Sequence, residues 1–161
     1  MTRTGIGFDA HRFAAGRRLV LGGVEIPHER GLLGHSDADV LTHALMDALL
    51  GAAADGDIGR HFPDGDPRWK DADSVELLRQ VAARLRRQGW EIVNADVTVL
   101  AEAPRLASHV PRMQERLAGA MGVTAGQISV KATTVEGMGA IGRGEGISAM
   151  AVATIERTGA V

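Results

Sequence analysis

Hydrophobic positions between residues 37 and 50 recur with the spacing of an α-helix. The apolar stripe comprises Val40, Leu41, Ala44, Leu45, Ala48 and Leu49. Ser36 and Asp39 match a capping box, so the pattern predicts a helix that begins at Asp37 and ends near residues 51–56. A second, polar stripe comprises Ser36, Asp39, His43 and Asp47. Short acids and a histidine, in place of the lysine, arginine and glutamate of a solvated face, indicate the wall of a site.

Two further helices follow from the same kind of pattern. Asp73 and Glu76 match a second capping box, and Gly89 lies where the helix that follows should end. The apolar stripe of this helix comprises Leu77, Leu78, Val81, Ala82 and Leu85. A third helix is predicted over Val110–Met121 and ends at Gly122. Its inward residues are Met113, Leu117, Ala120 and Met121.

Alternating apolar positions predict the strands. They cover residues 3–9, two short arms of 18–26 around Gly22 and Gly23, and residues 90–100, 128–134 and 147–157. The apolar face of residues 90–100 comprises Val93, Ala95, Val97 and Val99, and that of the last strand comprises Ile147, Ala149, Ala151, Ala153 and Ile155. Residues 57–72 and 135–146 are rich in glycine, proline or acids and are predicted to be long loops.

This order of elements predicts an α+β fold in a single domain that covers residues 1–161. The sheet should be mixed, with the helices packed on one face. The other face would then need cover, and the small residues that alternate along 147–157 favour a subunit interface there.

The composition is that of a globular domain, with 45% hydrophobic residues, 24% charged residues and a formal net charge of −2. The 18 Lys and Arg residues are spread along a chain poor in aromatics, which argues against a nucleic-acid partner. Apolar runs fall short of the ~18–20 residues of a transmembrane helix and the N-terminus lacks a signal-peptide core, so we predict a cytoplasmic protein without membrane contact. With no cysteine, any zinc must be held by imidazole and carboxylate groups.

Asp9, His11 and His43 are the first candidate metal ligands. Asp9 and His11 are two residues apart on a predicted strand and so point the same way. Together with His43 they form the one-carboxylate, two-imidazole set of a catalytic zinc site whose fourth position is open. Taken singly, the first two are also compatible with an ordinary surface and His43 with a hydrogen-bonded core histidine. The rival ligands, or partners that orient a ligating histidine, are Asp39, His35 and Asp47.

A second group of candidates lies in residues 131–146, KATTVEGMGAIGRGEG. The hydroxyls of Thr133 and Thr134 and the amides of glycine-rich backbone suit a phosphate-bearing ligand, and Glu136 suits a hard cation such as Mg²⁺. The alternative is a flexible turn. Arg105, at another predicted strand end, could meet phosphate or be solvated. Residues 57–66 could hydrogen-bond a polyol or form a capped surface loop.

Four segments resemble the 2-C-methyl-D-erythritol 2,4-cyclodiphosphate synthases of the non-mevalonate isoprenoid pathway. They are GIGFDAH, GLLGHSDADVLTHALMDALLGAAADGDIGRHFPD, ADVTVLAEAPR and KATTVEGMGAIGRGEGI. The resemblance runs in order from Gly5 to about Ile155. It implies a homotrimer of α+β subunits whose sheets face the threefold axis, with three active sites at subunit boundaries.

The same resemblance assigns roles to residues. It implies that Asp9, His11 and His43 hold zinc, and that Glu136 binds magnesium or manganese shared with the diphosphate. The implied catalytic residues are His35, Thr134 and Glu136. The phosphate and methylerythritol parts of the substrate would contact His35, Ser36, Asp57, Ile58, Gly59, Phe62, Pro63, Asp64, Gly65 and Asp66. The cytidine and diphosphate side, supplied by the neighbouring subunit, would include Ala101, Ala103, Pro104, Arg105, Leu106, Ala132, Thr133, Thr134, Val135 and Glu136. Asp39 is left to helix capping, and Asp47 is expected to orient an imidazole.

The reaction of the family converts 4-diphosphocytidyl-2-C-methyl-D-erythritol 2-phosphate into the 2,4-cyclodiphosphate and CMP. The substrate's own 2-phosphate attacks the β-phosphorus, so the enzyme must neutralise charge and align groups rather than supply a strong base. Two alternatives remain from the residues. One is a zinc-dependent phosphohydrolase that uses Glu136 or Asp57 as general base; the other is a metal-stabilised trimer that senses a cytidine nucleotide or an isoprenoid.

Three positions depart from the family pattern. Arg105 stands where lysine is common, and Val135 where threonine is often found. Arg143 also belongs to the predicted substrate-binding residues. In some members of the family, the arginine that it matches has been proposed to contact an isoprenoid diphosphate on the trimer axis. Those members carry an aromatic residue where this chain has Ala140, so we do not predict that ligand here.

Overall fold

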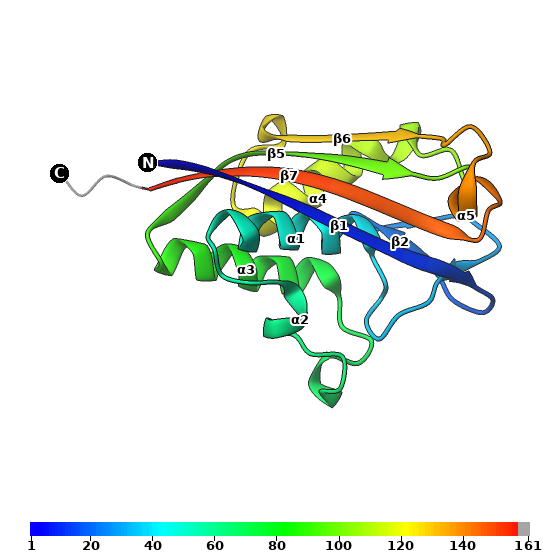
Figure 1. Ribbon diagram of the computed structural model, residues 1–161, viewed down its shortest axis with the longest axis horizontal. Coiled ribbons are helices and arrows are strands. Elements are labelled where there is room, and N and C mark those ends of the chain that lie inside the picture. Colours follow the sequence, from blue (N-terminus) through cyan, green and yellow to red (C-terminus); the bar gives the residue numbers. More distant parts are fainter. Residues whose placement is uncertain (158–161) are drawn as a thin grey trace.

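A five-stranded sheet with the order β4-β1-β7-β5-β6 forms one layer of the computed structural model, which describes residues 1–157 (Figure 1). Its strands are β1 (Thr2–Ala14), β4 (Gly31–Leu32), β5 (Trp90–Leu100), β6 (Ile128–Thr133) and β7 (Gly146–Arg157). β5 and β6 run parallel and the other neighbours are antiparallel, so the predicted mixed sheet is confirmed. β2 (Leu19–Leu21) and β3 (Val24–Ile26) form a separate hairpin.

Three long helices pack on one face of the sheet, as predicted (Figure 1). They are α1 (Val40–Ala52), α3 (Ser74–Arg87) and α4 (Val110–Met121). The two predicted loops are not fully irregular: the first contains α2 (Ile58–His61) and a 3₁₀ turn, and the second contains α5 (Gly139–Gly142). The 3₁₀ turns are Pro67–Trp69, Ala107–His109 and Ala125–Gln127. Within residues 1–157, no helix combines the length and apolar character needed to cross a membrane.

α1 begins at Val40, three residues later than predicted, and its N-cap is Asp39 rather than Ser36. The reason is Ala38, whose φ of 56° is left-handed and cannot belong to a right-handed helix. The Asp39 carboxylate accepts hydrogen bonds from the Thr42 amide (3.0 Å) and hydroxyl (2.7 Å). It also accepts the amides of Gly22 (2.9 Å) and Gly23 (2.8 Å), so the cap ties α1 to the β2–β3 turn. The capping role predicted for Asp39 is confirmed.

The other long elements start and end close to their predicted limits. The Asp73 side chain caps α3 by accepting from the Val75 amide at 2.9 Å, and Gly89 follows the helix at φ 80°. α4 has the predicted bounds and ends at Gly122 in the left-handed conformation. β1, in contrast, runs on to Ala14, and the short pairing partner β4 was not predicted.

Two predictions about strand faces are wrong. Ile92, not Val93, is buried in β5, because a β-bulge shifts the register with β7 between Ile92 and Asn94. The small residues that alternate along β7 do not form the open face of the sheet either. Ala149, Ala151 and Ala153 are buried in the hydrophobic core between sheet and helices.

The open face of the sheet instead carries large apolar side chains. Ile6, Phe8, Met150 and Val152 lie on the neighbouring strands β1 and β7, and each is between 43% and 66% exposed. A contiguous apolar patch of this kind marks an interaction surface on a folded protein.

The spacing between α1 and β1 is set by two glycines of β1. A Cβ built on Gly5 would overlap the backbone oxygen of Ala48, and one built on Gly7 would overlap that of Ala44. The helix backbone therefore lies directly against the strand. This contact brings His43 of α1 beside Asp9 and His11 of β1.

An ion pair joins α3 to the loop after α1 and should make stability depend on pH. Arg84 donates to both Asp55 oxygens and Gln88 donates to Oδ2, and these bonds lower the pKa of Asp55 to about 2. A lowered folded-state pKa stabilises the fold above the unfolded value of about 4 and loses that effect as the pH falls towards 2. Asp55→Asn should therefore lower the free energy of unfolding by about 1–2 kcal/mol at pH 7. In urea unfolding the difference should shrink substantially by pH 3.

The control is Glu76→Gln, which removes an exposed pair with Arg79 on the same helix. It should cost less than about 0.5 kcal/mol. An Asp55→Asn deficit that stays constant from pH 7 to pH 3 would contradict the assignment.

Candidate metal centre and substrate site

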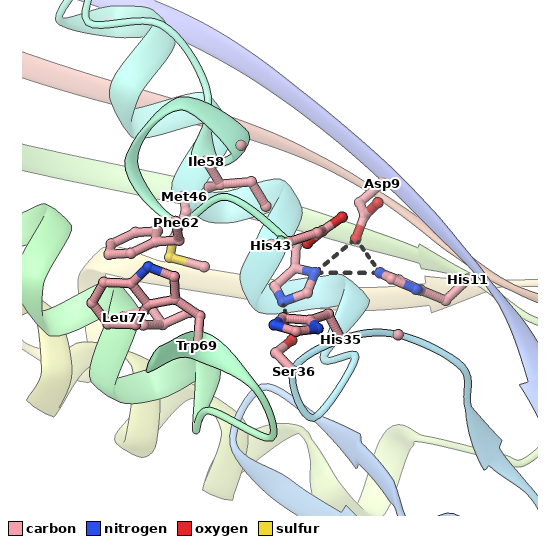
Figure 2. A pocket seen from close by; sticks show the side chains of 13 residues that line it. Asp9, His11, His35, Ser36, His43, Met46, Ile58, Phe62, Trp69 and Leu77 are labelled. Atoms are coloured by element: carbon pink, nitrogen blue, oxygen red, sulfur yellow. Dashed lines mark hydrogen bonds and ion pairs between the residues drawn. The ribbon is translucent and has the colours of Figure 1, made fainter. Parts of the chain in front are cut away.

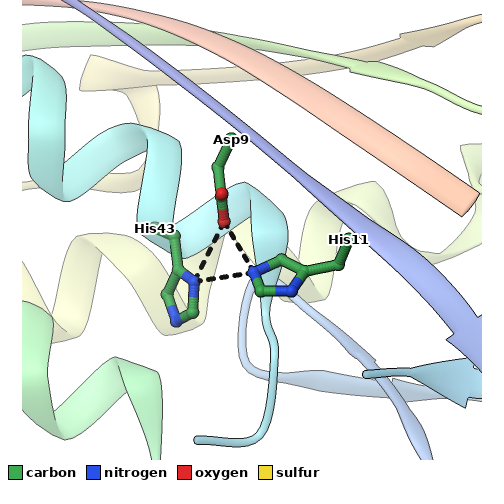
Figure 3. Close-up of side chains that lie close together, drawn as sticks. All are labelled: Asp9, His11 and His43. Atoms are coloured by element: carbon green, nitrogen blue, oxygen red, sulfur yellow. Dashed lines mark hydrogen bonds and ion pairs between the residues drawn. The ribbon is translucent and has the colours of Figure 1, made fainter. Parts of the chain in front are cut away.

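Asp9, His11 and His43 meet where β1 passes the first turn of α1 (Figure 3). Asp9 Oδ2 lies 2.9 Å from His11 Nε2 and 3.0 Å from His43 Nδ1, and the two nitrogens are 3.3 Å apart. Ligands bound tetrahedrally at about 2.0–2.1 Å from zinc are about 3.3 Å from one another. The three atoms are therefore spaced as they would be around one small cation, and the predicted grouping is confirmed.

The orientation of His11 is fixed from its far side. Its Nδ1 donates a hydrogen bond to the carbonyl oxygen of Leu33 at 2.7 Å, because a carbonyl can only accept. The proton is thus on Nδ1, and the lone pair of Nε2 faces the cluster. A carboxylate oxygen and an imidazole lone pair that face each other repel unless a cation or a proton lies between them. The donor set therefore fits a divalent metal ion.

His43 is buried and makes contacts with both ring nitrogens. Nδ1 faces Asp9, whereas Nε2 lies 2.9 Å from Ser74 Oγ and 3.2 Å from Ser36 Oγ. Burial raises the pKa of Asp9, but the interactions of its carboxylate with His11 and His43 outweigh burial and hold the pKa below its usual range. Asp9 is therefore ionised at neutral pH and supplies the negative charge of the cluster.

The cluster forms one wall of a cavity of about 200 Å³ (Figure 2). His35, Ser36, Ile58, Gly59, Phe62 and Asp64 of the predicted substrate set also line it. An apolar wall faces the cluster and adds Met46, Trp69 and Leu77, which were not among the predicted site residues. Trp69 stacks edge-on against Phe62, with ring centroids 5.1 Å apart. The cavity thus combines a charged end with an apolar end, as expected for a small polar ligand that carries carbon.

The remaining residues of the 57–66 loop hold its shape rather than line the cavity. Asp57 caps α2 by accepting from the Arg60 amide at 2.9 Å. Asp66 caps the Pro67–Trp69 turn and pairs with Arg68, while its carbonyl accepts from His35 Nε2 at 3.2 Å. The structure therefore joins the loop to His35. Pro63 and Gly65 belong to the same loop but not to the cavity wall.

The role predicted for Asp47 is wrong. Its Oδ1 accepts a hydrogen bond from the Ile58 amide at 2.8 Å, so it anchors the start of α2 rather than an imidazole. Burial, followed by the nearby charge of Asp57, raises the pKa of this carboxyl. The group that contacts His43 from behind is Ser74, at the start of α3.

The second half of the predicted substrate set lies at the ends of β5 and β6. These strands are parallel, with Leu100 opposite Thr133, so residues 101–106 and 132–136 leave the sheet side by side. Glu102 Oε1 accepts the amides of Val135 (2.9 Å) and Gly137 (3.4 Å), a clamp between the two loops that was not predicted. Thr134 Oγ1 donates to Glu136 Oε1 at 3.2 Å. In the described chain, residues 1–157, neither loop lines the metal cavity. Arg143 is also apart from it and pairs with Glu145 at 2.8 Å.

Comparison with known proteins identifies the family in which this fold and this site occur. Residues 2–156 match the YgbB family. The chain belongs to the YgbB family. It is 59% identical over 155 residues to the 2-C-methyl-D-erythritol 2,4-cyclodiphosphate synthase of Syntrophomonas wolfei. The aligned region covers 96% of this chain and 99% of that protein. The predicted family is therefore confirmed, and with it the prediction of an enzyme of this class.

Solved structures of YgbB-type proteins have the same fold. The bifunctional IspDF of Campylobacter jejuni superimposes with a TM-score of 0.94 at 43% identity over 98% of this chain, which spans 42% of that longer protein. A CDP-bound form of a 2C-methyl-D-erythritol-2,4-cyclodiphosphate synthase superimposes with a TM-score of 0.87 at 36% identity, covering 96% of this chain and all of the other. That relative binds a cytidine diphosphate.

Proposed function

We propose that this chain converts 4-diphosphocytidyl-2-C-methyl-D-erythritol 2-phosphate into 2-C-methyl-D-erythritol 2,4-cyclodiphosphate and CMP, a step of non-mevalonate isoprenoid synthesis. One observation carries the proposal. The Asp9, His11 and His43 cluster opens into a cavity bounded by residues 58–64, in a chain of the YgbB family. We further propose that residues 1–161 act as a single catalytic domain in the cytoplasm.

The cluster would hold zinc, and Glu136 would hold magnesium or manganese. When bound, these ions would neutralise the phosphate oxygens and polarise the attacked β-phosphate. Asp9, His11 and His43 would supply three ligands to the first ion, and a substrate oxygen would complete its coordination. Thr134 donates to the Glu136 carboxylate and so fixes the direction in which it faces.

The other residues of the cavity would align the substrate. His35 donates to the Asp66 carbonyl through Nε2, and this bond holds its ring beside the cluster. The Ser36 hydroxyl lies at the boundary between His43 and the cavity, where it can donate to a phosphate oxygen. The apolar wall around Phe62 would exclude water from the bound methylerythritol. Ring closure then depends on holding two anionic groups in contact, which is an orientation effect.

We propose that the active enzyme is a homotrimer with its sheets around the threefold axis. The exposed apolar residues of β1 and β7 would be covered in this assembly. The loops 101–106 and 132–136 lie outside the metal cavity of their own chain, which agrees with a cytidine site that a neighbouring subunit completes. Arg105 and the backbone of Ala132–Thr134 would then contact the nucleotide.

The test is incubation of the purified protein, loaded with zinc and magnesium, with the cytidyl substrate. ³¹P NMR should show the cyclic diphosphate and CMP in equal amounts, without inorganic phosphate. Release of inorganic phosphate or an open-chain product would instead support the zinc-dependent phosphohydrolase. Binding of the substrate without turnover would support the non-catalytic sensor.

A further inference from the structure

A chain of hydrogen-bonded side chains lies behind His43, on the side away from Asp9; His43 and Ser74 are buried and Asp37 is half-buried. His43 Nε2 is 2.9 Å from Ser74 Oγ, and Ser74 Oγ makes a short hydrogen bond to Asp37 Oδ1. The Ser74 amide donates to the other Asp37 oxygen at 3.0 Å. Ser74 is fully buried, so water cannot replace these partners. The chemistry of the proposed function does not use either residue.

The direction of each hydrogen bond follows from the acceptor at the end of the chain. An ionised carboxylate can only accept, so the hydroxyl hydrogen of Ser74 points to Asp37. Ser74 Oγ then has only lone pairs to offer His43, and the hydrogen between them must be on His43 Nε2. A neutral imidazole with a proton on Nε2 has its free lone pair on Nδ1, and Nδ1 is the atom that faces Asp9 and His11.

We propose that Asp37 and Ser74 are positioning residues that hold His43 in its Nε2–H tautomer and so aim Nδ1 at the metal ion. Partners of this kind fix the ring of a ligating histidine and raise its basicity. The proposal rests on the proposed metal site but not on the proposed reaction. It also separates the two serines that contact His43. Because the Nε2–H group of His43 donates its hydrogen bond to Ser74, the hydroxyl hydrogen of Ser36 remains available for a substrate oxygen.

The backbone holds the two ends of this chain together. The Asp37 amide donates to the Ala72 carbonyl at 3.1 Å, and the Asp71 amide donates to the His35 carbonyl at 2.8 Å. The segment before α1 is thus paired with the segment before α3. Ser74 is the first residue of α3, so the position of that helix determines where the hydroxyl meets His43.

Ser74→Ala tests the proposal with two measurements that do not depend on turnover. Zinc affinity, measured by competition with a chelator, should fall by about 10- to 100-fold. In the metal-free protein, ¹⁵N NMR of the His43 ring should show a protonated Nε2 and an unprotonated Nδ1, and the variant should show a mixture of tautomers. Zinc affinity within about twofold of the parent, or an unchanged tautomer in the variant, would overturn the proposal.

Ser36→Ala is the matched control, because it removes the other hydroxyl near the same nitrogen. It should leave the His43 tautomer unchanged. A tautomer change with Ser36→Ala but not with Ser74→Ala would show that Ser36 holds the ring, and would overturn the proposal. Asp37→Asn provides a second test if Ser74→Ala does not fold, and it should also weaken zinc binding and mix the tautomers. If Ser74→Ala weakens zinc binding while the parent protein yields no product in the cyclase assay, the positioning role stands and the proposed reaction fails.

Discussion

Replacing Asp9 by asparagine is expected to remove zinc from the protein and to abolish cyclisation while leaving the fold intact. The asparagine side chain keeps the shape of the aspartate but loses the negative charge that both histidines face at 2.9–3.0 Å. An amide is a poor zinc ligand, so the two imidazoles would be left to hold the ion. Removal of one preorganised electrostatic contact with a transition state costs about 10²–10³-fold in rate, and kcat/KM should fall by at least that factor. Zinc content by atomic absorption and the ³¹P assay measure the two effects.

Glu91→Gln makes the same carboxylate-to-amide change on another strand. Glu91 is an exposed residue of β5 outside the metal cavity, so this variant should keep its zinc and its activity. Circular dichroism should show the parent secondary structure for both variants. An Asp9→Asn protein that retained one zinc per chain and activity within tenfold of the parent would exclude the cluster as the metal centre.

Much of this architecture follows from local patterns in the sequence. The period of 3.6 located α3 and α4 almost to the residue, because the capping acid Asp73 marks the start of α3 and glycines follow the ends of both helices. The start of α1 was predicted three residues too early because Ala38 is left-handed. Alanine rarely adopts this conformation, so its residue type gives no signal of it. The bulge that buries Ile92 in place of Val93 arises from the pairing of β5 with β7, and no local pattern contains that information.

The candidate site divides in the same way. Asp9 and His11 could be grouped from a spacing of two on a strand, whereas their meeting with His43 depends on how α1 packs on β1. The partner of His43 could not be found, since Ser74 is 31 residues away and looks like an ordinary first residue of a helix. Asp47 was selected in its place because it shares a helix face with His43. Trp69 was missed because its loop has no periodicity.

Gly7→Ala should separate the helix from the strand and so disrupt the fold and the metal centre together. The added methyl group would meet the Ala44 carbonyl, a backbone atom that cannot rotate away, so α1 must shift as a body. Overpacking a core usually costs about 1–3 kcal/mol, and a collision with backbone should cost about 3 kcal/mol or more. That corresponds to a fall in Tm of roughly 6–12 °C for a chain of this length. Zinc affinity should fall as well, because His43 moves away from Asp9 and His11.

Gly119→Ala is the same change of glycine to alanine, but it should stabilise the protein rather than destabilise it. Gly119 is exposed in α4, and no atom lies within 4 Å of a Cβ built there. Alanine is the better helix former, so this variant should gain up to about 1 kcal/mol and keep its zinc. Thermal unfolding and chelator competition on the two variants separate the contact of α1 with β1 from any general effect of losing a glycine. Equal Tm and equal zinc affinity in the Gly7 and Gly119 variants would mean that helix and strand can part without affecting the cluster. The metal centre would then not depend on the close approach that β1 permits.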